Sequence, residues 1–375
     1  MASKTGVTPN VLRASDLKSL CTHDGPCITI TLPAYYLGAR ALPYATNLKT
    51  AVRVVEQELL KQDRYEDRER LLAPIHKLAK DLEDCEGGPD SVVFLSPGMF
   101  QRFYVPGPVL PRTTAGWHFH LLPFLDQLIV DREFYILGLN EKHLRLMRYS
   151  DGQCREVALP YGLPGNAEAA GAFAAPDHML RDRSLAGHSS GAQPAVLFGT
   201  SLERERAHER LHEFFRLVDQ GLSKILRGEP LLISGVDYEV AIYRRASAYR
   251  FLMEDHLAGD LHDESMQEIA RRVSEYARVQ ARKQAEKQLR LLRETAGTRT
   301  SFDIHRILKA AEEGRVSKVI LGVGDQAGLQ VSESASQEGL VNAIAVLSIR
   351  SGSEVFTLPA SAMAPTGRAA ASLRY

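Results

Sequence analysis

The chain has 375 residues, of which 44% are hydrophobic and 25% are charged; this is the composition of a soluble globular protein, at a length that suits two or three domains. The 46 basic and 46 acidic residues cancel, which excludes nucleic-acid binding through a uniformly positive molecule and leaves only local clusters of charge. No apolar run reaches about 18 residues, the first residues lack the apolar stretch of a signal peptide, and the four cysteines form no CxxC pair, so we expect a cytoplasmic protein with reduced thiols and no structural zinc.

Residues 1–128 carry the pattern of one α/β domain. Isoleucine and threonine alternate over Cys27–Pro33, which predicts a strand. Two amphipathic helices are predicted over NLKTAVRVVEQELL and ERLLAPIHKLAKDLED, and two further strands over SVVFLSP and FQRFYVP. The stretch GWHFHLLPFLDQL closes this domain.

A second pattern begins at residue 129. Strand-like runs between Glu133 and Pro160 are separated by turn residues and predict an antiparallel meander. The stretch Tyr161–Pro194 is rich in Gly, Ala, Pro and Ser, and we expect a mobile loop because it has too few large apolar side chains to offset its ordering entropy. The tripeptide GAQ lies near its end, and a strong helical pattern and the strand-like PLLISGV follow.

A long basic helix is predicted from about Glu264 to Thr295. Between Arg271 and Arg293 it has eight basic residues against two acidic ones, a net charge of +6. This helix presents either an ordinary solvated face or a stripe that contacts phosphates. Beyond it the pattern is again α/β, with helices over FDIHRILKAAEEG and EGLVNAIAVLSIRSG and strands over SKVILGVG and EVFTLP.

Two short motifs invite a ligand-binding interpretation that the sequence does not favour. His118 and His120 are spaced like a pair of metal ligands, but no third ligand with suitable spacing lies nearby, so packing is favoured and no metal is predicted. The sequence GVG that ends at Gly324 follows a predicted strand, but it lacks the third glycine and acidic residue of a dinucleotide site and the Lys-Ser/Thr of a P-loop. We therefore predict no cofactor.

The order of the motifs resembles a known family. A meander, a glycine-rich loop, Gly-x-Gln and the helix LERERAHERLHEFF resemble the middle domain of the class-1 release factors of archaea and eukaryotes, in which a GGQ loop precedes an Arg-rich helix. CITITLP, HLLPFL, FFRLVDQGL, LISGVDYEVAIYR and the terminal LRY resemble the bacterial archaeo-eukaryotic release factor family, and the resemblance covers nearly the whole chain. It implies three α/β domains: an N-terminal domain over residues 1–128, an RNase-H-like middle domain with a GGQ-like loop over 129–270, and a pelota-type RNA-binding domain over 271–375.

The resemblance also implies a chemistry for the tripeptide. Gly191 and Gln193 match the first glycine and the glutamine of GGQ, whose backbone holds an attacking water and the developing oxyanion at the ester of peptidyl-tRNA. Ala192 departs from the pattern, because alanine loses roughly 1–2 kcal/mol in a left-handed conformation that glycine adopts freely. Two alternatives stay open: Gly191, Ala192 and Gln193 hydrolyse peptidyl-tRNA, or the loop has no catalytic role.

The function that the resemblance implies is ribosome binding in the A site, for peptide release, rescue of stalled ribosomes or protection of idle ones. The expected partners are the ribosome and ribosomal RNA, the end of a transfer RNA and a translational GTPase; neither a membrane nor DNA is expected. An NIKS-type loop is absent, so stop-codon reading is not implied. The alternative is a binding protein that uses the same scaffold away from the ribosome. The candidate RNA-binding residues are Arg204, Arg206, Arg271, Arg272, Arg278, Arg282, Lys283, Lys287, Arg290 and Arg293.

Overall fold

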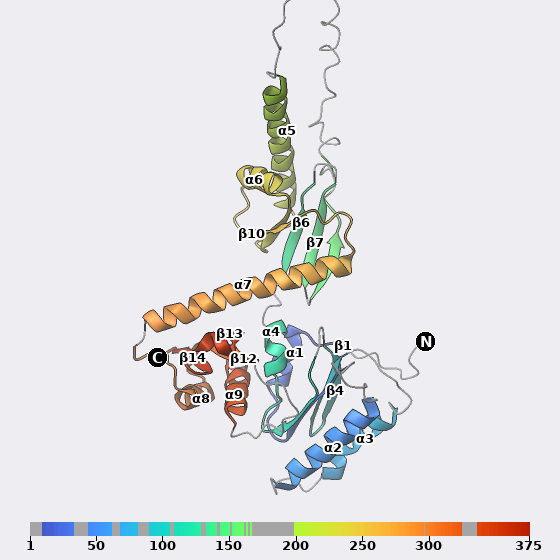
Figure 1. The fold of residues 1–375 in the computed structure, drawn as a ribbon, viewed down its shortest axis with the longest axis vertical. Helices are drawn as coiled ribbons and strands as arrows, with labels where there is room; N and C mark the ends of the chain where they lie inside the picture. Colours follow the sequence, from blue (N-terminus) through green and yellow to red (C-terminus); the bar gives the residue numbers. More distant parts are fainter. Residues whose placement is uncertain are drawn as a thin grey trace, which may run out of the picture. The chain divides into compact units, whose positions relative to one another are not determined.

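The chain forms two compact units with mixed α/β structure, which confirms the predicted fold class (Figure 1). Unit 1 contains Met1–Asp131 and Ala277–Tyr375, and unit 2 contains Arg132–Tyr276. The computed structural model describes residues 10–33, 44–61, 68–81, 90–105, 109–128, 133–140, 143–150, 152–160, 163, 166, 199–295, 297–324 and 336–375. Among these residues, no helix combines the length and the apolar character that crossing a membrane requires.

The first part of unit 1 is a five-stranded sheet in the order β1-β4-β3-β2-β5. Its strands are β1 (Asn10–Val11), β2 (Cys27–Leu32), β3 (Ser91–Ser96), β4 (Met99–Tyr104) and β5 (Arg112–Gly116), and its helices are α1 (Ala14–Leu20), α2 (Tyr44–Lys61), α3 (Arg68–Asp81) and α4 (Leu122–Leu128). Strand β2 is antiparallel to both β3 and β5. Every residue of β2 is buried, as expected of a strand covered on both faces.

The alternation in β2 explains the two layers around this sheet. Ile28, Ile30 and Leu32 share one face and pack with α2 and α3, and Figure 1 shows these two helices side by side against the strands. Cys27 lies on the other face, with Phe94 of β3 and with helices α1 and α4. The predicted strand and both predicted helices are therefore confirmed.

The second part of unit 1 is a four-stranded sheet in the order β11-β14-β12-β13. Its elements are β11 (Thr300–Ser301), α8 (Ile304–Glu312), β12 (Val316–Val323), α9 (Gln337–Arg350), β13 (Glu354–Pro359), the 3-10 helix η2 (Ala360–Met363) and β14 (Ala369–Leu373). Helix α9 connects the parallel strands β12 and β13, and β14 is antiparallel to β12. Helices α8 and α9 share one apolar core with the first sheet, because residues such as Phe94 and Ile344 belong to the same cluster.

Unit 2 is built on a five-stranded sheet in the order β10-β9-β6-β7-β8. Its elements are β6 (Phe134–Gly138), β7 (Arg145–Ser150), β8 (Gln153–Val157), α5 (Gly199–Leu222), β9 (Leu231–Gly235), α6 (Asp237–Ala246) and β10 (Leu252–Ala258). Strands β6, β7 and β8 are the predicted antiparallel meander, and β9 pairs parallel with both β6 and β10. Helices α5 and α6 pack on one face of the sheet, and the start of α7 (Met266–Glu294) packs on the other.

Helix α7 confirms the predicted long helix and starts at a capping box. The backbone N–H of Ser265 donates to Glu268 Oε2 at 3.0 Å, and the backbone N–H of Glu268 lies 3.3 Å from Ser265 Oγ. These reciprocal bonds satisfy amides at the helix start that have no partner within the helix. The residues of α7 divide between the two units at Tyr276 and Ala277. The predicted division into three domains stays a prediction.

Candidate nucleic-acid interface

The GAQ tripeptide lies outside the described residues. The same holds for most of Tyr161–Pro194, so the predicted mobility of this loop and the roles of Gly191, Ala192 and Gln193 stay predictions. Arg204 and Arg206 both lie in helix α5, and Arg206 is exposed. The geometry of the candidate site therefore comes from helix α7.

The second part of α7 has one buried face and one cationic face. Ala285, Leu289 and Leu292 are buried against the sheet of β12, β13 and β14. Lys283, Lys287 and Arg290 have the same spacing, and each stands two residues earlier in the chain. Two residues correspond to a rotation of about 200° in an α-helix, which turns these three side chains away from the sheet. All three are exposed, and we call them the cationic face.

Two of the predicted RNA-binding arginines form hydrogen bonds within the protein. Arg272 pairs with Glu264 and donates to the carbonyl oxygen of Ala258 at 2.5 Å. Arg293 lies near the end of α7, and its Nη2 donates to the carbonyl oxygens of Met363 and Ala364 at 3.2 and 3.0 Å and to the hydroxyl of Thr366 at 3.2 Å. These bonds give both arginines a role in holding neighbouring segments to the helix.

The remaining basic residues of α7 are Arg271, Arg278 and Arg282. Arg271 is exposed and Arg278 is half-buried. Arg282 is paired along the helix with Glu286, with Nε 3.2 Å from Oε1, and both side chains are more than 40% exposed. An ion pair of this kind contributes little to stability and leaves the guanidinium open to exchange partners. The cationic face is thus the part of α7 best suited to meet phosphates.

The two histidines of GWHFH contact different partners. His118 Nδ1 lies 3.5 Å from Asp24 Oδ1. His120 is 4% exposed, and its Nε2 lies 2.9 Å from Arg112 Nη1 and 3.4 Å from Glu338 Oε1. Burial lowers the pKa of both histidines.

Arg112, His120 and Glu338 form a buried ionic cluster that the sequence did not indicate. Arg112 pairs with Glu338, and their side chains are only 10% and 14% exposed. The hydrogen bond with His120, and then the positive charge of Arg112, lower the pKa of Glu338 to about 2. Arg112 and Glu338 are 226 positions apart, so no local motif signals the cluster. Within the described residues, no group of three or more metal-ligating side chains is found.

Gly322 of the GVG motif has a packing role. A Cβ at this position would lie 3.1 Å from Cγ of Met363 and 3.3 Å from Cα of Ala360. The glycine therefore allows η2 to approach strand β12 closely. This close approach explains the glycine without a phosphate ligand.

Comparison with known proteins connects the fold to one family. Residues 133–315 match the model of bacterial archaeo-eukaryotic release factor family 3. This range contains unit 2 from strand β6 onward, the GAQ tripeptide and all of α7. No curated protein matches the chain by sequence.

Solved structures of translation factors are similar to the chain at low identity. The archaeal termination factor aRF1 is 13% identical, with a TM-score of 0.26, over 97% of this chain and 99% of that one. Archaeoglobus fulgidus Pelota is 11% identical, with a TM-score of 0.37, over 100% and 96%. A model of ribosome-bound archaeal Pelota and ABCE1 contains a chain that is 11% identical, with a TM-score of 0.40, over 98% and 95%. TM-scores this low do not establish a common whole-chain arrangement.

Proposed function

This chain belongs, over residues 133–315, to the bacterial archaeo-eukaryotic release factor family, and on that premise we propose that it is a ribosome-binding factor that acts in the ribosomal A site. Its candidate roles there are peptide release, rescue of stalled ribosomes and protection of idle ribosomes. In this role the protein works in the cytoplasm and contacts ribosomal RNA and the end of a transfer RNA. A translational GTPase is a further candidate partner.

The cationic face of α7 is the observation that supports RNA binding best. The molecule has no net charge, so attraction to RNA has to come from a local cluster. Lys283, Lys287 and Arg290 are such a cluster, exposed and within the range that matches the family. They span about 10 Å along the helix axis. Each phosphate that they neutralise releases counterions and strengthens binding.

Two modes of action remain, and they differ in the role of the GAQ tripeptide. In the first, Gly191 and Gln193 take part in hydrolysis of peptidyl-tRNA by orienting a water and stabilising the oxyanion. In the second, the protein occupies the ribosome without chemistry. Ala192 favours the second mode, because the backbone penalty of alanine lowers the population of a left-handed loop conformation.

Release of a labelled peptide from ribosomes with an empty A site distinguishes the two modes. Ala192→Gly restores the family tripeptide, and each 1.4 kcal/mol of backbone strain that it relieves raises the rate about tenfold. Wild-type activity that Gln193→Ala abolishes supports hydrolysis. Confirmed ribosome binding without release by either the wild type or Ala192→Gly supports occupancy alone. Failure of the protein to cosediment with 70S particles at physiological salt would contradict the ribosomal function altogether.

A further inference from the structure

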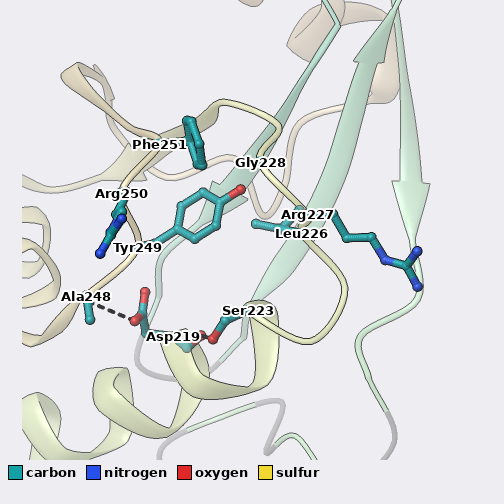
Figure 2. Close-up of a pocket in the computed structure, with 9 residues that line it drawn as sticks. All are labelled: Asp219, Ser223, Leu226, Arg227, Gly228, Ala248, Tyr249, Arg250 and Phe251. Atoms are coloured by element: carbon teal, nitrogen blue, oxygen red, sulfur yellow. Dashed lines mark hydrogen bonds between the residues drawn. The ribbon is translucent and has the colours of Figure 1, made fainter.

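An open hollow of about 360 Å³ lies in unit 2, between the end of α5 and the segment that joins α6 to β10. Figure 2 shows the side chains that line it. Asp219 comes from the last turns of α5, Gly228 from the following turn, and Tyr249 and Phe251 from the segment before β10. The cationic face is not among its lining residues, so the hollow needs its own explanation.

Asp219 fixes one wall of the hollow and keeps part of its hydrogen-bonding capacity. Asp219 is 5% exposed. Oδ1 accepts hydrogen bonds from the hydroxyls of Ser247 at 2.5 Å and Tyr243 at 3.2 Å, and Oδ2 accepts one from the backbone N–H of Ala248 at 2.9 Å. A carboxylate has about four acceptor positions. Counting only hydrogen bonds from the described residues, one position is therefore left for a donor that enters the hollow.

Two aromatic rings form the apolar part of the hollow. The rings of Tyr249 and Phe251 meet edge to face, with centroids 5.8 Å apart. The hydroxyl of Tyr249 donates to the carbonyl oxygen of Glu229 at 2.7 Å, which holds this ring in place. Phe251 is 52% exposed. The exposed ring is available for stacking.

One arginine stands beside these rings. In Figure 2 Arg250 lies next to Tyr249, whereas the guanidinium group of Arg227 points away from the ring. Arg250 is exposed, and among the described residues its guanidinium has no hydrogen bond or ion pair. The hollow thus combines an aromatic surface, one acceptor and the positive charge of Arg250.

We propose that this hollow binds one unstacked base of single-stranded RNA. The base stacks on Phe251, as bases do on aromatic side chains of single-strand binding proteins. An exocyclic amino group donates to the remaining acceptor of Asp219, and a neighbouring phosphate contacts Arg250. Cytosine fits this acceptor, whereas the one ring donor of uracil lies between two carbonyl oxygens that the carboxylate repels. The inference deepens the proposed function by adding an RNA contact, and it is testable without ribosomes.

The probes are labelled pentamers of cytidylate and of uridylate, which differ at the amino group that Asp219 is expected to bind. We expect the full chain to bind the cytidylate pentamer more tightly, as measured by fluorescence anisotropy. Phe251→Ala should weaken this binding roughly tenfold or more, because stacking on an aromatic side chain is worth about 1–3 kcal/mol per base. Arg250→Gln should lower the slope of log K against log salt by about 0.7, the loss of one phosphate contact in a single strand.

Matched controls are available in the same unit. Tyr238→Ala removes an aromatic residue of α6 that is 49% exposed, and Arg155→Gln removes an exposed cation of β8; neither residue lines the hollow. Both should leave pentamer binding unchanged. Equal binding of the two pentamers, or no effect of Phe251→Ala, would overturn the inference. It is also overturned if Phe251→Ala weakens ribosome association but no pentamer binds, since the hollow then takes a protein side chain. Pentamer binding without ribosome association would instead contradict only the proposed function.

Discussion

The pair of Arg112 and Glu338 concentrates charge in the interior of unit 1. The two groups contact each other with little exposure to solvent, and His120 completes the cluster. Removing one partner of a buried pair leaves the other charge uncompensated, which costs about 3–5 kcal/mol. The cluster joins strand β5 to helix α9, so its loss should lower the free energy of unfolding of unit 1.

We expect Glu338→Gln to destabilise unit 1 by about 3 kcal/mol at neutral pH. The pKa of Glu338 is about 2 in the folded protein against an ordinary 4.5, so its contribution is complete above pH 4.5 and is lost as the pH falls toward 2. The difference between the variant and the wild type should therefore shrink in acid. His120 also makes unit 1 less stable in acid. Burial lowers its pKa below 6.5, so its protonation as the pH falls favours the unfolded chain. Urea unfolding followed by the fluorescence of Trp117, the single tryptophan, measures both effects.

Glu354→Gln is the matched control for this measurement. Glu354 pairs with Lys318 at 3.4 Å, but the two side chains are 59% and 36% exposed. Its loss should cost at most about 1 kcal/mol. A Glu338→Gln effect that is equally large at neutral pH and near pH 3 would show that the charge of Glu338 does not stabilise the fold.

Helix α7 uses its two sides for different purposes. The side with Ala285, Leu289 and Leu292 packs on a sheet, and the cationic face of Lys283, Lys287 and Arg290 is exposed. Exposed charges contribute little to folding. The cationic face can therefore be removed while the fold is kept.

The triple substitution Lys283→Gln, Lys287→Gln and Arg290→Gln should weaken ribosome binding at low salt. It should also reduce the slope of log K against log salt by about two to three units, up to about one unit for each lost phosphate contact. The control replaces three exposed cations of α2 and α3 with glutamine: Arg53, Lys77 and Lys80. If the slope of the cationic-face variant equals that of the wild type, this face is merely solvated.

Sequence periodicity predicted those elements that bury large apolar side chains on a regular face. Strand β2 and helices α2, α3 and α7 belong to this group. Strands β5 and β14 were not predicted, because their sequences RTTAG and AAASL contain few of the branched and aromatic residues that mark a strand. They are held by their pairing with β2 and β12. The local pattern of apolar residues indicates which side chains are buried, but it does not indicate with which distant strand a segment pairs.

The candidate sites, too, were predicted from the sequence only in part. The basic character of α7 is visible in the sequence, but which cations face away from the sheet follows from packing. Asp219 and Phe251 meet at the hollow only through the turns between α5 and β10. Asp219 stands in FFRLVDQGL, one of the stretches that resemble the family, but the resemblance assigned it no role, and Phe251 stands in no motif. Their combination was therefore not predicted.

Unit 1 unites the two ends of the chain in one core. The backbone N–H of Leu121 donates to Asn342 Oδ1 at 2.8 Å across 221 positions of sequence, and Asn342 Nδ2 donates back to the carbonyl oxygen of Phe119 at 2.9 Å. No sequence pattern indicates such a contact. In unit 2, the chain between strands β8 and β9 contains the GAQ tripeptide, whereas the cationic face of α7 belongs to unit 1.

The most direct test is a cryo-EM reconstruction of ribosomes that carry peptidyl-tRNA, with the full chain added. We predict density for the protein in the A site, with Lys283, Lys287 and Arg290 against ribosomal RNA and Gln193 near the end of the transfer RNA. Binding elsewhere on the ribosome, with α7 facing solvent, would contradict the proposed mode of action. The ribosomal function itself would be contradicted if the reconstruction showed an empty A site while the protein cosedimented with RNA other than ribosomal RNA under the same conditions.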